Sequence, residues 1–294
     1  MATWHEIFNK IDTGNALEEL KKQFFNDLHK ETNRNVVVYF SAWQQKTGVN
    51  GAFSITDNDR NGFMNVLHGL DKSLGLDLIL HTPGGDLTAT KSIVEYLYSY
   101  FDGNIRVIVP HTAMSAGTMI ACSGKEILMG LHSNLGPIDP QINNVPANEY
   151  LETFQEALKQ VSENKNKEYW QNVLKNYPPT FFGLCKKAID LSEKYVSDWL
   201  SRCMLKDSQD DVALTVKYLA DYKTHLQHST RLHIDDLLTN TKLKITRLED
   251  NHKLQDLVLS LYHCYQILAE RTSITKIIEN HNNLKYINNL PNHR

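Results

Sequence analysis

The sequence predicts an α/β protein whose central strands run parallel, because one local pattern repeats in the middle of the chain. An apolar run, a turn of small residues and a segment with helical periodicity follow one another twice. The first repeat is LDLILHTPGG (76–85) with a helix over 86–101, and the second is IRVIVP (105–110) with a tight turn and a buried helix over 111–124. Alternation of strands and helices is typical of parallel sheets.

The N-terminal part adds a helical arm, a strand and a helix. Apolar residues recur at helical spacing over 2–30, at Phe8, Ile11, Leu17, Leu20, Phe24 and Leu28. The run NVVVYFSAW (35–43) is compact and apolar, which predicts a buried strand. Residues 56–74 are expected to be helical, with Thr56 or Asp57 as the N-cap.

The second half of the chain has a mainly helical pattern. Residues 126–141 predict a short strand followed by a loop, and residues 224–245 predict a turn, a short helix and a strand. Helices are expected over 149–175 (one or two), 181–205 and 254–270.

Composition excludes several classes of protein. The 294 residues are 41% hydrophobic and 22% charged, and the formal net charge of −3 gives no general attraction to nucleic acid or to an anionic membrane. No apolar run approaches the roughly 20 residues that cross a bilayer, and the N-terminus lacks the pattern of a signal peptide. We therefore expect a cytoplasmic protein with reduced cysteines at Cys122, Cys185, Cys203 and Cys264.

Two segments carry the chemistry of acyl transfer, which needs a nucleophile, a base and donors aimed at the developing oxyanion. In HTPGGD, Gly84 and Gly85 end a strand, and glycine permits the dihedral angles that turn backbone N–H groups outward. In AMSAGT, Ser115 lies where a helix begins, and the unpaired N–H groups there favour negative charge. The N–H of Ala116 is a second candidate oxyanion donor.

Together the two segments resemble the ClpP/crotonase superfamily, in which the first glycine turn forms the oxyanion hole and the serine of the second is the nucleophile. The longer string VPHTAMSAGTMIA…EILMGLHSNLGPIDPQI resembles a narrower group, the serine dehydrogenase proteinase family, which is related to signal peptide peptidase A. The resemblance continues through TFFGLCKKAIDLSEKYV and QHSTRLHIDDL to LQDLVLSLYHCY, so it covers most of the chain after Asn35.

This resemblance implies a ClpP/crotonase-like spiral of ββα units with added N- and C-terminal helices. It divides the chain into an N-terminal helical arm (1–34), a catalytic core (35–250) and a C-terminal helical extension (251–294). Members of the superfamily form rings or stacked oligomers. Amphipathic helices at both ends of this chain suit such assembly, so we expect a homo-oligomer.

The motifs leave the general base open. The histidine of Clp peptidases would fall near Ile138 and Asp139, so it is absent at that place. Relatives of signal peptide peptidase A use a lysine instead, made basic at neutral pH by burial. Lys187 in LCKKAID matches a lysine of the family and is the first candidate, with Lys186 next. His228 in QHST matches a family histidine and is a candidate base, orienting residue or structural histidine.

Each candidate also has a structural interpretation. A Pro-Gly-Gly turn is common, and a serine that begins a helix is usually an N-cap. Lys187 is also compatible with a surface position on an amphipathic helix. His81 and His111 precede the two turns and are expected to be structural, although His111 is close in sequence to Ser115. Asp139 precedes a proline and is expected to position its loop through backbone N–H groups.

The sequence thus predicts an ATP-independent serine endopeptidase that cleaves extended peptides through a Ser-Lys acyl-enzyme mechanism. No P-loop, dinucleotide-binding, HExxH or Cys/His motif is present, so we expect no cofactor and no metal. Two alternatives stay open: a crotonase-like acyl-CoA enzyme, whose oxyanion hole stabilises an enolate without a serine, and a catalytically inactive scaffold. The expected partners are a protein or peptide substrate and further copies of the chain, without nucleic acid or a membrane span.

Overall fold

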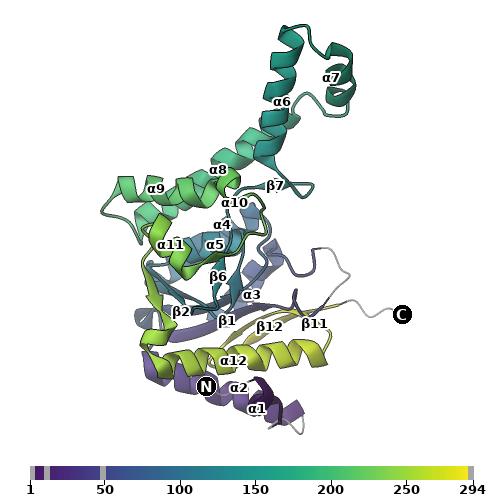
Figure 1. The fold of residues 1–294 in the computed structure, drawn as a ribbon. Coiled ribbons are helices and arrows are strands. Elements are labelled where there is room, and N and C mark those ends of the chain that lie inside the picture. The colour runs from purple at the N-terminus through teal and green to yellow at the C-terminus, as the bar shows by residue number, and fades with distance from the viewer. Residues whose placement is uncertain (1–3, 10–13, 47–50, 291–294) are drawn as a thin grey trace.

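A seven-stranded sheet forms the centre of the computed structural model, which describes residues 4–9, 14–46 and 51–290 (Figure 1). The strand order is β10-β5-β3-β2-β1-β11-β12. In chain order these strands are β1 (Asn35–Ser41), β2 (Leu76–His81), β3 (Ile105–Val109), β5 (Glu126–Met129), β10 (Ile245–Arg247), β11 (Ile274–Asn280) and β12 (Lys285–Asn289).

Five neighbouring strands of this sheet, from β10 to β1, run parallel. Leu78 of β2 pairs with Val37 of β1 on one side and with Val107 of β3 on the other. The two remaining strands, β11 and β12, run antiparallel to their neighbours. The α/β class with a mostly parallel sheet is therefore confirmed.

Helices cover both faces of the sheet, as Figure 1 shows. On one face lie α2 (Gly14–Thr32) and α12 (His252–Arg271), with α1 (Trp4–Asn9) beside them. On the other lie α3 (Asp57–Leu67), α4 (Leu87–Phe101) and the short α5 (Ala116–Cys122). Because side chains alternate along a strand, β1 sends Val37 and Tyr39 into one apolar core and Val38 and Phe40 into the other.

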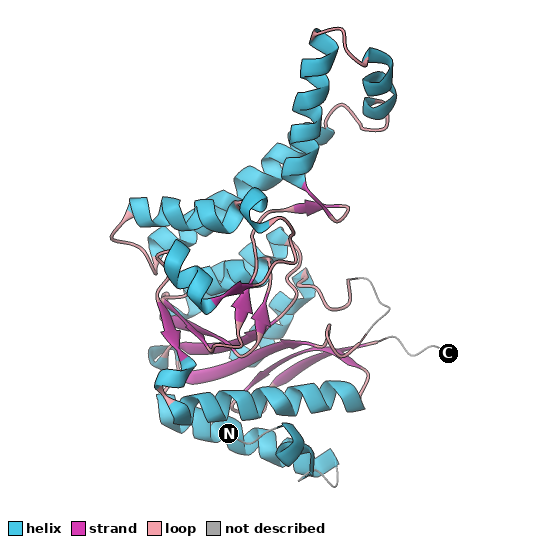
Figure 2. Ribbon diagram, in the orientation of Figure 1, coloured by secondary structure: helices cyan, strands magenta, loops and turns pink. Residues whose placement is uncertain are grey.

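A helical projection extends from the α4–α5 side of the molecule (Figure 2). It contains α6 (Ala147–Ser162), α7 (Lys167–Leu174) and the N-terminal part of α8 (Phe181–Arg202), and the stacked rings of Phe154 and Phe182 join α6 to α8. The remaining helices are α9 (Gln209–Ala220), α10 (Tyr222–His225), α11 (Ile234–Asn240), η1 (Lys72–Leu74) and η2 (Leu248–Asp250). Short strands form two further sheets: β4 (Thr112–Ala113), β6 (Asn134–Leu135) and β9 (Leu232–His233) in one, β7 (Gln141–Ile142) and β8 (Val145–Pro146) in the other.

The ends of the chain differ from the expectation. The N-terminal arm consists of two helices, α1 and α2, and the part of the predicted helix over 10–13 lies outside the described residues. The prediction of a helical extension over 251–294 is wrong beyond α12, because residues 274–289 form β11 and β12. All seven residues of β11 are buried, since both faces of the sheet are covered there. A short run buried on both sides shows no amphipathic period from which to identify it.

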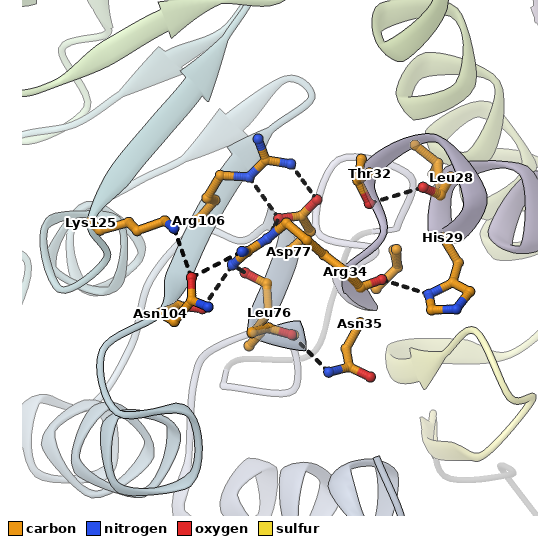
Figure 3. A network of polar contacts seen from close by, with 12 residues as sticks. Leu28, His29, Thr32, Arg34, Asn35, Leu76, Asp77, Asn104, Arg106 and Lys125 are labelled. Carbon is orange, nitrogen blue, oxygen red and sulfur yellow. Dashed lines mark hydrogen bonds and ion pairs between the residues drawn. The ribbon is translucent and has the colours of Figure 1, made fainter. Parts of the chain in front are cut away.

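A polar network ties together the N-terminal ends of the central strands (Figure 3). The buried carboxylate of Asp77 accepts hydrogen bonds from Arg34, at 2.6 Å, and from Arg106, at 2.7 Å on its other oxygen. Arg34 and Lys125 both donate to the side-chain oxygen of Asn104. This network lies at the edge of the sheet opposite to the carboxyl ends of the parallel strands, where ligands of such sheets bind.

Candidate active site

The turns that follow β2 and β3 meet at one pocket of about 520 Å³. The Gly84–Gly85 turn follows β2, and Ser115 and Ala116 follow β3 and the short β4. His228, from the loop between α10 and β9, also lines the pocket. Five of the six residues assigned to the site from sequence are thus brought together, from three separate segments of the chain.

Ser115 is held in an unusual backbone conformation, with φ 51° and ψ −114°. A non-glycine residue in such a region costs on the order of 1–3 kcal/mol and persists only where its surroundings impose it. Ser115 occupies the N-cap position of α5, but its side chain makes no capping hydrogen bond. Asp86, by contrast, caps α4 by accepting from the N–H of Ala89 at 2.7 Å. The hydroxyl of Ser115 therefore does not serve as a helix cap and is available for other chemistry.

The small residues around Ser115 permit close packing. A Cβ on Gly117 would lie 2.6 Å from Cγ2 of Thr82, so glycine lets α5 approach the end of β2. The hydroxyl of Thr118 accepts from the N–H of Gly136 at 2.9 Å and lies 2.8 Å from the Gly136 carbonyl, to which it donates. These bonds connect the SAGT segment to the loop that carries Asp139. They give a physical reason why SAGT and GPIDPQ occur together in the longer string quoted above.

The Gly84–Gly85 turn needs two glycines because other backbone lies against it. A Cβ on Gly84, whose φ is +96°, would lie 2.7 Å from the Met114 carbonyl and 2.9 Å from Cβ of Ser115. A Cβ on Gly85 would lie only 2.2 Å from the backbone nitrogen of Ile55. The Gly84–Gly85 turn is therefore packed between Met114 and Ser115 on one side and Ile55 on the other.

Two backbone N–H groups at the pocket are unused. Among the residues that the structure describes, no hydrogen bond leads from the N–H of Gly85 or of Ala116 to an acceptor. The expectation for Gly84 needs correction, because its N–H donates to Oγ1 of Thr82 at 3.1 Å. Gly84 allows the close approach of the turn to Ser115, while Gly85 and Ala116 are the candidate oxyanion donors.

His228 is oriented by a buried carboxylate. Its Nδ1 lies 2.8 Å from Oδ1 of Asp139, and the two side chains are 27% and 1% exposed. An ionised carboxylate only accepts hydrogen bonds, so Nδ1 carries the proton and Nε2 is left with a free lone pair. The other oxygen of Asp139 accepts from the side-chain amide of Gln141 at 2.7 Å. The expected role of Asp139, binding backbone N–H groups, is replaced by contacts with these two side chains.

The loop that carries Asp139 is itself fixed. The Ile138 N–H donates to the Leu219 carbonyl at 2.9 Å, and the hydroxyl of Ser192 donates to the Ile138 carbonyl at 2.7 Å. The sequence has no histidine near Ile138 and Asp139, where a Clp-type base would fall. In the folded chain, His228, which lies 89 residues after Asp139, comes to this place, and no local pattern predicted that contact.

The structure does not bring Lys187 into the pocket. Lys186 and Lys187 are both exposed on α8, and neither lines the cavity. The next residue, Ala188, and Ser192, one turn further, face it instead. Lysine needs burial to become a base at neutral pH, and this position gives none. The amphipathic pattern of α8 places Lys187 on the exposed side of the helix and Ala188 beside the pocket.

His81 and His111 are close in sequence to the two turns but have a structural environment. His81 is 1% exposed, and burial together with the nearby His111 lowers its pKa to about 3. Its Nδ1 lies 3.1 Å from the Thr112 carbonyl, and its ring packs against Phe40 and Tyr262. Neither histidine lines the cavity.

Two other kinds of feature are absent from the part of the chain that the structure describes. No cluster of three His, Cys, Asp or Glu side chains there is arranged to hold a metal ion. No helix among those residues has the length and apolar character needed to cross a membrane.

Comparison with known proteins adds a family. The sequence model of the ClpP-like SDH-type serine proteinases matches residues 21–273, a range that includes every residue lining the pocket. Among solved structures, a serine-to-alanine mutant of the membrane-bound stomatin-specific protease 1510-N aligns with a TM-score of 0.41 and 16% identity, over 69% of this chain and 79% of that one. So distant a match says nothing about the site.

Two relatives come from Methanocaldococcus jannaschii, and both are uncharacterized proteins. MJ1495 is 30% identical over 211 residues, which are 72% of this chain and 64% of MJ1495. MJ0137 is 41% identical over 93 residues, which are 32% of each chain. The matches thus span less than two thirds of the length of either relative.

Proposed function

Because this chain belongs to the ClpP-like SDH-type serine proteinase family, we propose that it is a serine endopeptidase that works without ATP. The observation that carries the proposal is a single pocket lined by Ser115, the Gly84–Gly85 turn and His228, with His228 hydrogen-bonded to the buried Asp139. A nucleophile, an oriented base and free N–H donors are the three elements that acyl transfer requires.

The proposed reaction follows from these positions. Oγ of Ser115 attacks the scissile carbonyl carbon as its proton passes to Nε2 of His228. The carbonyl electron pair moves onto oxygen, and the N–H groups of Gly85 and Ala116 stabilise the resulting oxyanion. When the tetrahedral intermediate collapses, the C–N bond breaks and the leaving amine takes the proton from His228. The product of this half-reaction is an ester on Ser115.

Water completes the cycle. His228 accepts a proton from the water as its oxygen attacks the ester carbonyl, and the same two N–H groups stabilise the second oxyanion. Collapse breaks the bond to Ser115, whose oxygen recovers the proton from His228. A carboxylic acid product leaves. Asp139 stays ionised throughout and stabilises the protonated imidazole.

We assign the base to His228 rather than to Lys187 on the contacts of each. His228 lines the pocket and has a fixed ring orientation, whereas Lys187 is exposed outside it. This assignment replaces the Ser-Lys dyad with a Ser-His-Asp arrangement. Its carboxylate and histidine come from loops other than those expected for a Clp-type triad.

The substrate proposed is an extended peptide. The pocket has an apolar part formed by Leu87, Met119, Ile138 and Ala188, which suits an uncharged side chain of the substrate. Extended peptides bind proteases by backbone hydrogen bonds that add a strand. The β7–β8 hairpin contributes Gln141 to the lining beside this apolar part.

The test is hydrolysis of fluorescein-labelled casein without ATP by wild type, Ser115→Ala and His228→Gln. Lys187→Met is the matched control, since it removes the lysine expected from sequence. We expect no detectable cleavage by Ser115→Ala and a fall in kcat of roughly 10³–10⁴-fold for His228→Gln. Lys187→Met should stay within about twofold of wild type.

Other outcomes lead to other assignments. Loss of activity in Lys187→Met with retention in His228→Gln would restore the Ser-Lys dyad. Undiminished cleavage by Ser115→Ala would mean that the nucleophile is wrong. A wild type that neither cleaves casein nor reacts with a fluorophosphonate would point to the inactive scaffold. Light scattering on the same samples tests the expected homo-oligomer against the 33.7 kDa of one chain.

A further inference from the structure

A buried lysine lies behind the active-site turn, on a strand that the sequence analysis did not predict. Lys276 is in β11, and its side chain is only 4% exposed. Its Nζ lies 2.7 Å from Oδ2 of Asp59, on α3, whose side chain is 1% exposed. Burying two charges is costly, and removing one partner leaves an uncompensated charge. Such a pair calls for an explanation beyond stability.

The same ammonium also binds backbone beside the pocket. Nζ of Lys276 donates to the carbonyl of Ser54 at 2.8 Å, and Ser54 lines the active-site cavity. The carboxylate oxygen of Asp59 that pairs with Lys276 also accepts from the N–H of Thr56 at 2.7 Å. The Lys276–Asp59 ion pair therefore binds the backbone on both sides of Ile55, at Ser54 and at Thr56.

Ile55 is hydrogen-bonded to the residues on both sides of Gly85. Its N–H donates to the Gly84 carbonyl at 2.8 Å, and its carbonyl accepts from the N–H of Asp86 at 2.9 Å. These two bonds bracket Gly85, whose Cα faces Ile55 with no room for a side chain. The position of the Gly85 N–H is thus set by Ile55, and the position of Ile55 by the contacts of Lys276 and Asp59.

We propose that Lys276 is a positioning residue for the oxyanion hole, acting through Ser54 and Ile55 on the N–H of Gly85. The inference rests on the proposed function of the same pocket. Lys276 lies beyond residues 21–273, the range matched by the family. Its role therefore comes from this chain's own contacts.

The structure offers a matched control on the same strand. Glu279 of β11 forms an equally buried ion pair with Lys21 of α2, with a distance of 2.8 Å and side chains 2% and 1% exposed. Side chains three residues apart on a strand point to opposite faces, so this pair lies on the α2–α12 side, away from the pocket. Lys21→Met and Lys276→Met each remove one buried ammonium group. Only Lys276→Met removes a contact with the loop that packs against the Gly84–Gly85 turn.

The experiment measures three quantities for wild type, Lys276→Met and Lys21→Met. They are kcat and KM on labelled casein, the rate constant for fluorophosphonate labelling of Ser115, and the free energy of unfolding in urea. Both variants should lose stability. Only Lys276→Met should lose kcat, by about 10–100-fold with KM changed less than about twofold, because a displaced donor acts on the transition state. Its labelling rate should fall in parallel.

A folded Lys276→Met variant whose kcat and labelling rate equal those of Lys21→Met overturns the positioning role and leaves the proposed function intact. A wild type inactive in both assays overturns the proposed function itself. If Lys276→Met does not fold, the double variant Lys276→Met with Asp59→Asn removes both charges and keeps an acceptor for Thr56. The double variant should show the same loss of kcat, and wild-type kcat in it also overturns the proposal.

Discussion

At the scale of single residues, the hydrogen-bond partners and the burial of each histidine determine which of its ring nitrogens carries a proton and how readily the ring is protonated. The hydrogen bond to Asp139 selects one tautomer of His228 and directs its free nitrogen away from the carboxylate. His81, another imidazole near the glycine turn, has a very different environment. It is buried among aromatic rings without a carboxylate, and its pKa is lowered to about 3. The same residue type is thus the proposed base in one place and a neutral, packed ring in the other.

The depressed pKa of His81 predicts how stability depends on pH. Above pH 6.5 the imidazole is neutral in both the folded and the unfolded chain; below it only the unfolded chain takes up the proton, until the pH reaches about 3. The free energy of unfolding therefore falls as the pH falls through this window, by up to about 1.4 kcal/mol per pH unit from this group. His81→Phe keeps an aromatic ring and should lose this dependence.

Urea unfolding of wild type and His81→Phe over that range of pH measures the effect. The stability of wild type should fall more steeply towards acid than that of the variant. Parallel curves would show that His81 does not remain neutral in the folded protein. His111, whose pKa burial also lowers, is present in both proteins.

At the scale of elements, the position of the Gly84–Gly85 turn depends on contacts with a second loop, which contains Ile55. The turn after β2 rests on residues 53–56, which are held by Ser41 of β1 through the Phe53 carbonyl and by Lys276 of β11 through the Ser54 carbonyl. Gly85 is the point of closest approach. A turn built in this way has little freedom to move without disturbing the central sheet.

Gly85→Ala should therefore damage both activity and stability. The added Cβ would lie 2.2 Å from the Ile55 nitrogen, so one loop must shift. We expect kcat on casein to fall by at least about 100-fold, as for loss of an oxyanion donor. Gly69→Ala is the control: its φ is +79° and nothing lies within 4 Å of an added Cβ. It should cost only the strain of a left-handed residue, about 1–2 kcal/mol, and leave kcat unchanged. Equal kcat in the two variants would contradict the assignment.

At the scale of the whole molecule, the end of the chain completes the centre of the fold. Strand β11 pairs with β1, so residues 274–280 cover an edge that the parallel strands leave open. They also supply the buried Lys276 and Glu279, which pair with helices on opposite faces. The sheet and both helical layers are therefore joined through one strand.

Truncation tests this dependence. A chain ending at Ser273 lacks β11 and β12 and exposes β1. It also leaves the buried Asp59 without its ion-pair partner, and it leaves Lys21 paired with Glu18 but not with Glu279. It should show no cooperative unfolding transition by circular dichroism, because unpaired strand edges and unpaired buried charges both disfavour the fold. A chain ending at Leu290 keeps β12 complete and should unfold like wild type. Cooperative unfolding of the shorter chain would mean that β11 is an appendage.

The sequence by itself determined what depends on neighbouring residues. The alternation of apolar runs, small-residue turns and helical segments identified the parallel strands, because strand and helix periods are local properties. The Gly84–Gly85 turn and Ser115 follow two of these strands, and the resemblance of their motifs to the ClpP/crotonase superfamily made them site candidates. The glycines of these motifs are needed because the backbone of the Gly84–Gly85 turn lies close to that of Met114 and Ile55.

Only the tertiary structure decided which distant residues meet. His228 reaches Asp139 across 89 positions and Lys276 reaches Asp59 across 217, and no local pattern encodes either contact. Lys187 and Ala188 are neighbours in sequence, but the rotation of α8 exposes the first and turns the second into the pocket. β11 escaped prediction because a strand buried on both faces has no alternation to read. The proposed nucleophile and the glycine turn are local features of this chain, whereas the proposed base and the contacts that support the turn depend on tertiary folding.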